Sequence, residues 1–421
     1  MSGARGRQTP LIPEPPGYAA RMKVLVTSAR MPFALAVMRR LCDAGHEVLS
    51  SDTYDAAPGN HSRYVTAHAV TASPRADTER FIEQVGAFCS EHGVDVIVPT
   101  WEEAFYLATG RERLEAVATL YTPPFETLAR VHDKHSFEQL VEQLGIPAPV
   151  GVTVRGDAEL REAIGRWPRY FGRGVYSRGG VTLLTNTGPL AGRVRVEDVH
   201  PTPDAPWLVQ EFVDGPMVCT YSTLHAGRVT GHCTYRAPRQ YHHSTAVQFE
   251  SITGEETLAV VERLGAALDY TGQMSLDFVD SGHGLMIIEC NPRTTDGALL
   301  MESDELAGSL LDPDQELVMV PPGRLTQLDL AVIGAMFSDG LSDVPGSIHD
   351  LLRIPGADRG WHDQLPNLYS FLAFCHHERL SLREHEKLQV AMYEDVSWDG
   401  EPIDGMTAGQ SAALAELHAG R

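Results

Sequence analysis

The sequence predicts a multi-domain α/β (α+β) protein in which a doubly wound parallel sheet is followed by a largely antiparallel unit. With 421 residues, 43% of them apolar, the chain is too long for one ordinary core and can fill two or three. Strand, helix and strand patterns follow one another over residues 22–52, and a hairpin pattern occupies residues 272–293. The first order is typical of parallel sheets and the second of antiparallel sheets.

The parallel sheet is expected to begin with the short apolar run of residues 22–27. A helical pattern over residues 32–44 is followed by a glycine stop and a second strand pattern over residues 45–52. Residues 94–99 resemble a later strand of the same sheet. The first turn, residues 27–30, lacks the G-x-G-x-x-G spacing, so the sequence disfavours a dinucleotide site there.

Charge and composition narrow the function classes. The chain has 34 Lys and Arg against 56 Asp and Glu, a formal net charge of -22, which disfavours nucleic-acid and anionic membrane partners. The six scattered cysteines indicate reduced thiols and a cytoplasmic location. Residues 1–21 are polar and proline-rich, so we expect a flexible tail rather than a signal peptide, and no apolar run is long enough to span a membrane.

The predicted hairpin, residues 272–293, carries the most informative polar residues. If its turn lies near residue 283, Asp277 is opposite or next to Glu289, and period-two alternation puts Asn291 on the same face. Four apolar side chains are then expected to point the other way: Leu276, Phe278, Ile288 and Cys290.

Two carboxylates that face each other across a strand pair repel, and a bound cation removes that cost. Asp277, Glu289 and Asn291 offer only hard oxygen ligands, which suit Mg²⁺ carried with the phosphates of a nucleotide. The alternative is a solvated sheet face that tolerates like charges. The asparagine two residues after Glu289, followed at once by proline and Arg293, favours the metal site.

A lysine opens a predicted amphipathic helix. Phe137, Leu140, Val141 and Leu144 have helical spacing, and Gly145 and Pro147 end the pattern. Asp133 is the expected N-cap, which places Lys134 in the first turn, where the helix dipole disfavours a cation. A bound anion would reverse that preference, and a solvated lysine is the alternative. The chain has only three lysines, so one at such a position is informative.

The stretch Tyr170–Gly180 contains four glycines and two arginines, a composition that can hold an anion against the backbone. It stands between Lys134 and the segment Val-Gln-Glu-Phe-Val-Asp-Gly that ends at Gly215, and the hairpin ending Ile-Glu-Cys-Asn-Pro-Arg293 follows. In this order and spacing, over about residues 22–310, the chain resembles the ATP-grasp superfamily and its carboxylate–amine ligase branch.

The resemblance implies an ATP-grasp fold with a central antiparallel sheet. Residues 22–120 would form a Rossmann-like pre-ATP-grasp domain, and residues 121–315 the ATP-grasp domain with a glycine-loop lid at about 150–215. Residues 316–421 would be a C-terminal extension that could cap the sheet, form a dimer contact or shape the acceptor pocket. The oligomeric state stays open, with a homodimer among the alternatives.

The resemblance also implies site residues and cofactors. ATP would bind with one or two Mg²⁺ ions, or Mn²⁺, the metal being held by Asp277, Glu289 and Asn291. Arg293 and Arg173 would act in catalysis, with Arg293 on the transferred phosphoryl group or the substrate carboxylate. The nucleotide would be bound by Lys134, Arg173, Arg178, Gly179, Gly180, Gln210, Glu211, Phe212 and Val213.

The sequence departs from the family pattern at two positions. Arg173 stands where relatives carry a second phosphate-binding lysine; arginine keeps the charge but is a planar fork rather than a point charge. In a chain this poor in lysine, compositional drift is an alternative explanation. Met217 stands where relatives carry a glutamate for the ribose hydroxyls, and methionine cannot accept those hydrogen bonds.

The substrates are weakly encoded. In residues 232–243, Arg236, Arg239 and His243 are candidates, together with Arg293, for contacts to a substrate carboxylate; a basic surface loop is the alternative. The leading hypothesis is a ligase that joins a small carboxylic acid, such as an amino acid or peptide, to an amine. A kinase that releases a phosphorylated product and a non-catalytic ATP-binding module are the other hypotheses.

Overall fold

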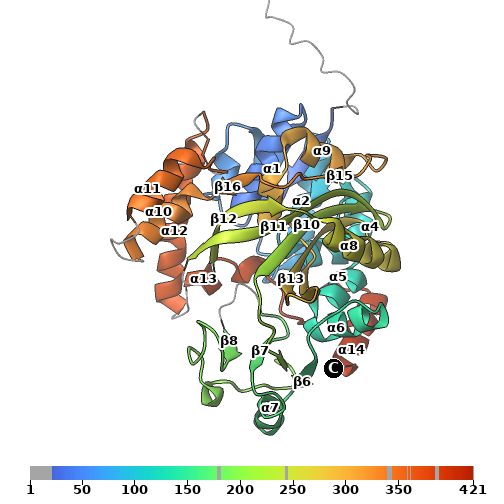
Figure 1. The fold of residues 1–421 in the computed structure, drawn as a ribbon. Coiled ribbons are helices and arrows are strands. Elements are labelled where there is room, and N and C mark those ends of the chain that lie inside the picture. Colours follow the sequence, from blue (N-terminus) through green and yellow to red (C-terminus); the bar gives the residue numbers. More distant parts are fainter. Residues whose placement is uncertain are drawn as a thin grey trace, which may run out of the picture.

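The computed structural model describes residues 21–177, 182–241, 245–338, 344–357, 359–360, 362–384 and 388–420. Within these ranges the chain forms three sheets surrounded by helices (Figure 1). The division into residues 22–120, 121–315 and 316–421 stays a prediction, and the sheets are described by their strands.

The first sheet is parallel, with strand order β3-β2-β1-β4-β5. All three residues of β4 and the last three of β1 are buried, because helices cover both faces of such a sheet. The predicted strands and helix over residues 22–52 and 94–99 are confirmed. The elements are β1 Lys23–Val26, α1 Pro32–Asp43, β2 Glu47–Asp52, η1 Pro58–His61, β3 Val65–Val70, α2 Thr78–His92, β4 Val96–Val98, α3 Glu103–Thr109, α4 Arg111–Glu115 and β5 Thr119–Leu120.

The second sheet is large and mainly antiparallel, with strand order β14-β13-β10-β11-β12-β16 and β15 beside β11. Helix α8 contacts β10 and β11 of this sheet. The elements are β10 Met217–His225, β11 Arg228–Tyr241, β12 Thr245–Ile252, α8 Glu255–Leu268, β13 Gly272–Asp280, β14 Leu285–Asn291, η3 Asp296–Leu300, α9 Ser303–Leu311, β15 Val318–Met319 and β16 Leu325–Gln327.

The predicted hairpin is confirmed as β13 and β14, but one of its expected side-chain directions is wrong. The register shifts between Asp277 and Phe278, so that Phe278 pairs with Ile287. Ile287 therefore joins the buried cluster with Leu276 and Phe278, where Ile288 was expected. Ile288, directly before Glu289, is therefore the extra residue of a β-bulge in β14.

The third sheet, which we call the small sheet, has the order β6-β9-β7-β8 and lies at the bottom of Figure 1. Its own apolar cluster includes Val154, Leu184 and Val209, together with Leu160 of α7. Two helices, α5 and α6, precede it. The elements are α5 Phe125–His132, α6 Lys134–Gln143, β6 Gly151–Val154, α7 Asp157–Ile164, β7 Tyr170–Gly174, β8 Leu183–Thr185, η2 Val196–Asp198 and β9 Trp207–Glu211.

The C-terminal residues return to the first sheet. Helix α12 contacts η1, and α14 contacts α5. Trp398 of the C-terminal residues is fully buried, and its ring stacks on that of Phe105 in α3 with 4.6 Å between centroids. The elements are α10 Asp329–Ser338, α11 Val344–Arg353, α12 Leu365–Glu384, α13 Leu388–Ala391, η5 Glu394–Val396 and α14 Ala408–Ala419.

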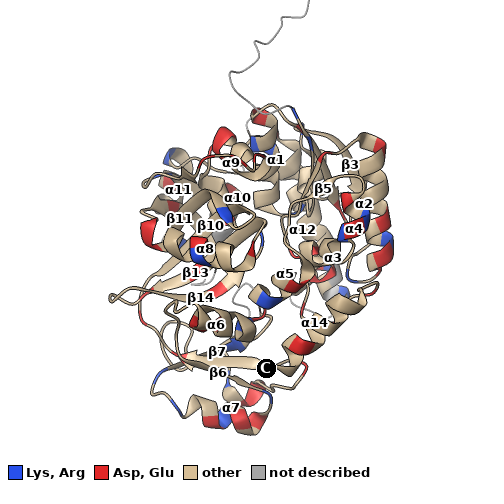
Figure 2. Cartoon of the chain, turned by 90° about the vertical axis from the view of Figure 1, so that its right-hand side faces the viewer, with Lys and Arg blue, Asp and Glu red and all other residues tan. Residues whose placement is uncertain are grey.

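Acidic and basic residues are interspersed on the outer helices α2, α4 and α7 (Figure 2). In the part of the chain that the structure describes, no helix is both long and apolar enough to cross a bilayer. All six cysteines are free thiols.

Candidate functional site

A pair of facing carboxylates forms the centre of the site. Asp277 of β13 is paired directly with Glu289 of β14, as the sequence predicts. Their neighbours Leu276, Phe278 and Cys290 are buried on the opposite face, and this apolar packing holds both strands in place. The two acidic side chains therefore have to share one face of the sheet.

The small sheet supplies a cation to this pair. Arg173 of β7 donates from Nη1 to Glu289 Oε2 at 2.6 Å, and its Nη2 donates to the backbone oxygen of Ile288. The guanidinium is 6% exposed, so the contact is shielded from water. The two terminal guanidinium nitrogens of Arg173 thus have separate acceptors, which the planar, forked guanidinium group allows and a single ammonium group does not.

Helix α6 supplies a second cation. Asp133 caps the helix by accepting a hydrogen bond from the backbone nitrogen of Ser136 at 2.8 Å, so the predicted cap is confirmed. Lys134 is buried in the first turn, where its Nζ donates to the backbone oxygens of Ser177 at 2.7 Å and Val175 at 3.3 Å. The same nitrogen lies 3.8 Å from Glu289 Oε2. Lys134 thus links the glycine-rich stretch to the carboxylate pair.

The two carboxylates have opposite pKa shifts. Burial and the negative charge of Glu289 raise the pKa of Asp277 above its ordinary value. Burial also acts to raise the pKa of Glu289, but the positive charges of Arg173 and Lys134 outweigh it and the pKa is lowered. A bound cation beside Asp277 would weaken the repulsion between Asp277 and Glu289.

Asn291 and Arg293 extend the site beyond the pair. The Asn291 side-chain nitrogen donates to Asp277 at 3.1 Å and to Glu289 at 3.2 Å, and its oxygen accepts from Arg293 Nη2 at 3.2 Å. Arg293 also lies over the ring of Trp101, with Cζ 3.9 Å from the ring centroid. This cation–π contact and the hydrogen bond fix the direction of the guanidinium.

The donor set fits a hard divalent cation. In the described ranges no group of three or more His, Cys, Asp or Glu side chains is placed to hold a metal ion, so the candidate consists of two carboxylates and one amide. Rotation of the Asn291 amide by a half turn would present its oxygen to the same point without changing its shape. Three oxygen donors that leave positions open for phosphate and water are typical of Mg²⁺ sites.

The segment predicted to meet the adenine runs from the end of β9. Gln210 is buried and donates to Glu138 of α6 at 2.6 Å, and Glu211 accepts from the backbone nitrogen of Val150 at 3.1 Å. Burial raises the pKa of Glu138 to about 7, although the Gln210 hydrogen bond acts in the opposite direction. The backbone of Phe212 and Val213 follows directly, and the side chain of Met217 is 37% exposed.

Four predicted site residues, Arg178, Gly179, Gly180 and His243, lie outside the described residues. The predicted substrate arginines have protein partners. Arg236 pairs with Glu250 across β11 and β12 at 2.8 Å, and Arg239 pairs with Asp350 of α11 at 2.9 Å. Their roles in substrate binding stay a prediction.

Sequence reasoning missed two residues near Arg293. Trp101 lies three residues after the end of β4, and its backbone nitrogen donates to Glu103 at 3.3 Å. Asp296 begins η3 three residues after Arg293, and burial raises its pKa to about 6 although Arg293 acts in the opposite direction. A signal for Trp101 was present, because side chains just after a parallel strand lie at the ligand-binding edge of such a sheet.

No protein-family model matches the sequence, whereas solved structures match most of the chain. N5-carboxyaminoimidazole synthetase from Staphylococcus aureus, complexed with ADP, is similar with a TM-score of 0.58 at 11% identity, over 76% of this chain and 86% of its own. The biotin carboxylase domain dimer of Hydrogenobacter thermophilus 2-oxoglutarate carboxylase, with MgADP and bicarbonate, has a TM-score of 0.52 at 16% identity, over 69% and 70%. An L-amino acid ligase from Bacillus licheniformis has a TM-score of 0.51 at 15% identity, over 73% and 79%.

These similarities show the class of fold. The parallel first sheet, the small sheet and the large antiparallel sheet together make the ATP-grasp fold, as the sequence resemblance implied. At identities of 11–16% the similarity concerns the fold, and the chemistry has to be argued from the residues of this chain.

Proposed function

We propose that the protein is an ATP- and Mg²⁺-dependent ligase that activates a small carboxylic acid as an acyl phosphate and joins it to an amine. The observation that carries the proposal is the meeting of Asp277 and Glu289 with two cations, Arg173 and Lys134, from separate elements. Two acidic and two basic side chains that meet at one point suit a complex of a metal ion with the triphosphate of ATP. The metal ion would interact with the two carboxylates and the phosphates with the two cations, in place of the present ion pairs. An amino acid or a peptide is the proposed acid.

The reaction has two steps. A carboxylate oxygen of the acid attacks the γ-phosphorus of ATP, the bond to the bridging oxygen breaks, and ADP leaves. The amine nitrogen then attacks the carbonyl carbon of the acyl phosphate, phosphate leaves, and the nitrogen loses a proton. Neither step needs a protein nucleophile, so the contribution of the protein is positioning and charge neutralisation.

Each cation of the site has a distinct task in this scheme. Lys134 and Arg173 neutralise the phosphate oxygens of the nucleotide, and Arg293, held on Trp101, binds the transferred phosphoryl group or the carboxylate of the acid. Asp277, Glu289 and Asn291 are the residues that would hold Mg²⁺, which neutralises the β- and γ-phosphates when bound. The small sheet, linked to the site through Arg173, shields the acyl phosphate from water.

An ADP-release assay over a panel of amino acids, with and without a panel of amines, tests the proposal. Amine-dependent ADP release with an amide detected by mass spectrometry is the expected result. A phosphorylated acid that accumulates as the end product, with no amide, would identify a kinase instead. Nucleotide binding without ADP release under any combination would identify a non-catalytic module.

A further inference from the structure

A cavity of about 510 Å³ lies between the parallel sheet and the C-terminal helices, and its lining shares no residue with the carboxylate-pair site. Its volume is within the range of small-molecule sites. The cavity is lined by Thr53, Tyr54, Ser73, Arg75, Ala76, His376, His377, Ala391, Glu394 and Asp395. Half of its wall therefore comes from α12, α13 and η5 of the C-terminal residues.

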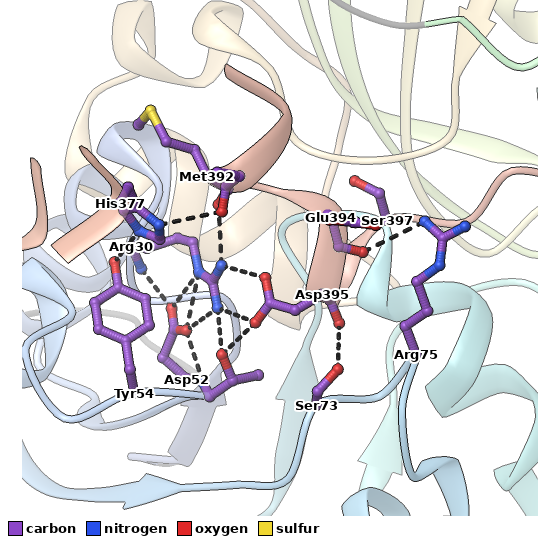
Figure 3. A network of polar contacts seen from close by, with 12 residues as sticks. Arg30, Asp52, Tyr54, Ser73, Arg75, His377, Met392, Glu394, Asp395 and Ser397 are labelled. Atoms are coloured by element: carbon purple, nitrogen blue, oxygen red, sulfur yellow. Dashed lines mark hydrogen bonds and ion pairs between the residues drawn. The ribbon is translucent and has the colours of Figure 1, made fainter. Parts of the chain in front are cut away.

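The cavity lies at the edge of the sheet where ligands of open α/β folds bind. Thr53 and Tyr54 directly follow β2, and Arg30 follows the neighbouring strand β1. Both are carboxyl ends of parallel strands, the edge at which such sheets bind small molecules. Figure 3 shows the C-terminal residues Met392–Asp395 placed against this edge.

A buried arginine makes one wall of the cavity rigid. Arg30 donates to Asp52 from Nε at 2.9 Å and from Nη2 at 2.6 Å, and it donates to Asp395 from Nη1 at 2.6 Å and from Nη2 at 2.9 Å (Figure 3). Nη1 also donates to the backbone oxygen of Met392 at 3.0 Å. With these donors satisfied by protein, Arg30 holds the two halves of the cavity together and does not offer an anion site.

Aromatic rings form a second wall. Tyr54 stacks on His376 with 5.3 Å between ring centroids, and it meets His377 edge-on at 5.2 Å. His377 Nδ1 donates to the backbone oxygen of Ala391 at 3.2 Å, so Nε2 is left to accept from the Tyr54 hydroxyl at 3.3 Å. Burial lowers the pKa of His377 to about 4, in agreement with this neutral state. The Arg30 guanidinium lies over the Tyr54 ring, with Cζ 4.8 Å from the ring centroid, so the protein itself already places a cation against this aromatic wall.

Acidic groups outnumber basic groups around the cavity. Arg75 pairs with Asp399 at 2.9 Å and with Glu401 at 3.2 Å, as Arg30 pairs with two carboxylates of its own. The lining carboxylate of Glu394 adds a further negative charge. Each arginine is thus already neutralised by carboxylates, so an anionic ligand would be repelled and a cation attracted.

We propose that this cavity binds a small organic cation, namely an ammonium group carried on an apolar or aromatic body. The ammonium group would lie beside the carboxylates of Glu394 and Asp395, and the body would contact His376, Ala76 and Ala391. The site goes beyond the proposed ligase chemistry. Its binding requires neither nucleotide nor turnover.

Isothermal titration calorimetry with three probes of matched shape tests the proposal. Tyramine carries the ammonium group, 4-ethylphenol has the same ring without it, and 3-(4-hydroxyphenyl)propionate replaces it with a carboxylate. We expect tyramine to bind at least about 10-fold more tightly than 4-ethylphenol, and the acid to bind most weakly. Equal affinity for the three probes, tighter binding of the acid, or no binding of tyramine would overturn the proposal.

A cavity-filling variant locates the binding. Ala76 is exposed and lines the cavity, so Ala76→Trp should weaken tyramine binding at least about 10-fold while the melting temperature stays close to that of the wild type. The matched control is Ala87→Trp, which fills a second cavity of about 360 Å³ beside α2 and should leave the affinity unchanged. His376→Ala removes a lining ring and should weaken binding several-fold, which keeps the proposal testable if Ala76→Trp folds poorly. If Ala76→Trp and His376→Ala both leave the tyramine affinity unaltered, tyramine binds elsewhere and the proposal is wrong.

Discussion

Two clusters of this protein each contain an arginine and two carboxylates, and the clusters differ in which charges are neighbours. Arg30 lies between Asp52 and Asp395 and donates hydrogen bonds to both. Arg173 instead binds Glu289 alone of the facing pair, while Asp277 lies across the strands from Glu289. The first cluster places opposite charges together, whereas the second also places like charges together.

The pKa shifts express this difference. Burial acts to raise the pKa of Asp395, but Arg30 outweighs it and the pKa is lowered. For Asp277, burial and the charge of Glu289 act together, and the pKa is raised. Both carboxylates of the Arg30 cluster therefore have a cationic partner within the protein, as expected of a structural element. The carboxylate pair keeps an unfavourable interaction that a ligand can remove, as expected of a functional site.

Removal of the like charges should have the largest effect on function. We expect Asp277→Asn combined with Glu289→Gln to lower amine-dependent ADP release by about 10³-fold or more, because the proposed metal ligands lose their charge. The stabilisation of the protein by MgATP should disappear, because the side chains proposed to hold the metal have lost their charge. Activity assays and thermal melts measure both.

Glu250→Gln is the matched control for this variant. Glu250 also belongs to the large sheet, but it faces Arg236 rather than another carboxylate. The control should keep its ADP release and its stabilisation by MgATP. Normal turnover in the Asp277 and Glu289 variant would refute the metal assignment.

Removal of one carboxylate charge from the Arg30 cluster should mainly affect stability. Asp52→Asn should lower the free energy of unfolding by about 3–5 kcal/mol, because Arg30, whose side chain is 3% exposed, would lose a buried partner. Urea denaturation measures the loss. Asp399→Asn, at the half-exposed pair with Arg75, should cost at most about 1 kcal/mol. Similar losses in both variants would contradict the distinction between the buried and the exposed ion pair.

The geometry of the Arg173 fork allows a sharper test of the functional cluster. We expect Arg173→Lys to lower kcat by about 10- to 100-fold, because one ammonium group cannot reproduce separate bonds from Nη1 to Glu289 and from Nη2 to Ile288. Steady-state kinetics with the identified substrates measure the change. A near-normal kcat would support compositional drift in a chain with three lysines.

The last expected effect concerns pH. The folded-state pKa of Glu138 is raised from 4.5 to about 7, chiefly by burial, so the unfolded chain releases this proton first as the pH rises. The wild type should therefore lose stability between about pH 4.5 and 7, by about 3 kcal/mol in total. Glu138→Gln can still accept from Gln210 and should lack this loss. Denaturation curves at several pH values would show parallel losses in both proteins if the assignment is wrong.

Local patterns predicted the Asp277–Glu289 pair better than they predicted the Arg30 cluster. The facing of Asp277 and Glu289 follows from strand alternation and a short turn, and the cap at Asp133 follows from the helix start, so both could be found in the sequence. The β-bulge that replaces Ile288 by Ile287 in the core could not, because alternation assumes a regular ladder.

Contacts between distant parts of the chain could not be predicted. Arg30 and Asp395 are separated by 365 positions, and no local pattern links an arginine after the first strand to an acid near the C-terminus. The ion pairs of Arg236 and Arg239 likewise depend on which strand and helix pack beside them. In a single sequence, such pairings are set by tertiary packing rather than by period or propensity.

The burial of Trp398 gives the protein an intrinsic optical reporter. Its indole ring lies 5.5 Å from the ring of Tyr176, in the stretch that follows β7 and whose backbone is held by Lys134. Movement of that stretch when nucleotide binds would alter the surroundings of Trp398, which lies near the C-terminus. In a variant whose other four tryptophans are replaced by phenylalanine, the emission of Trp398 would then report movement of this stretch without any attached dye.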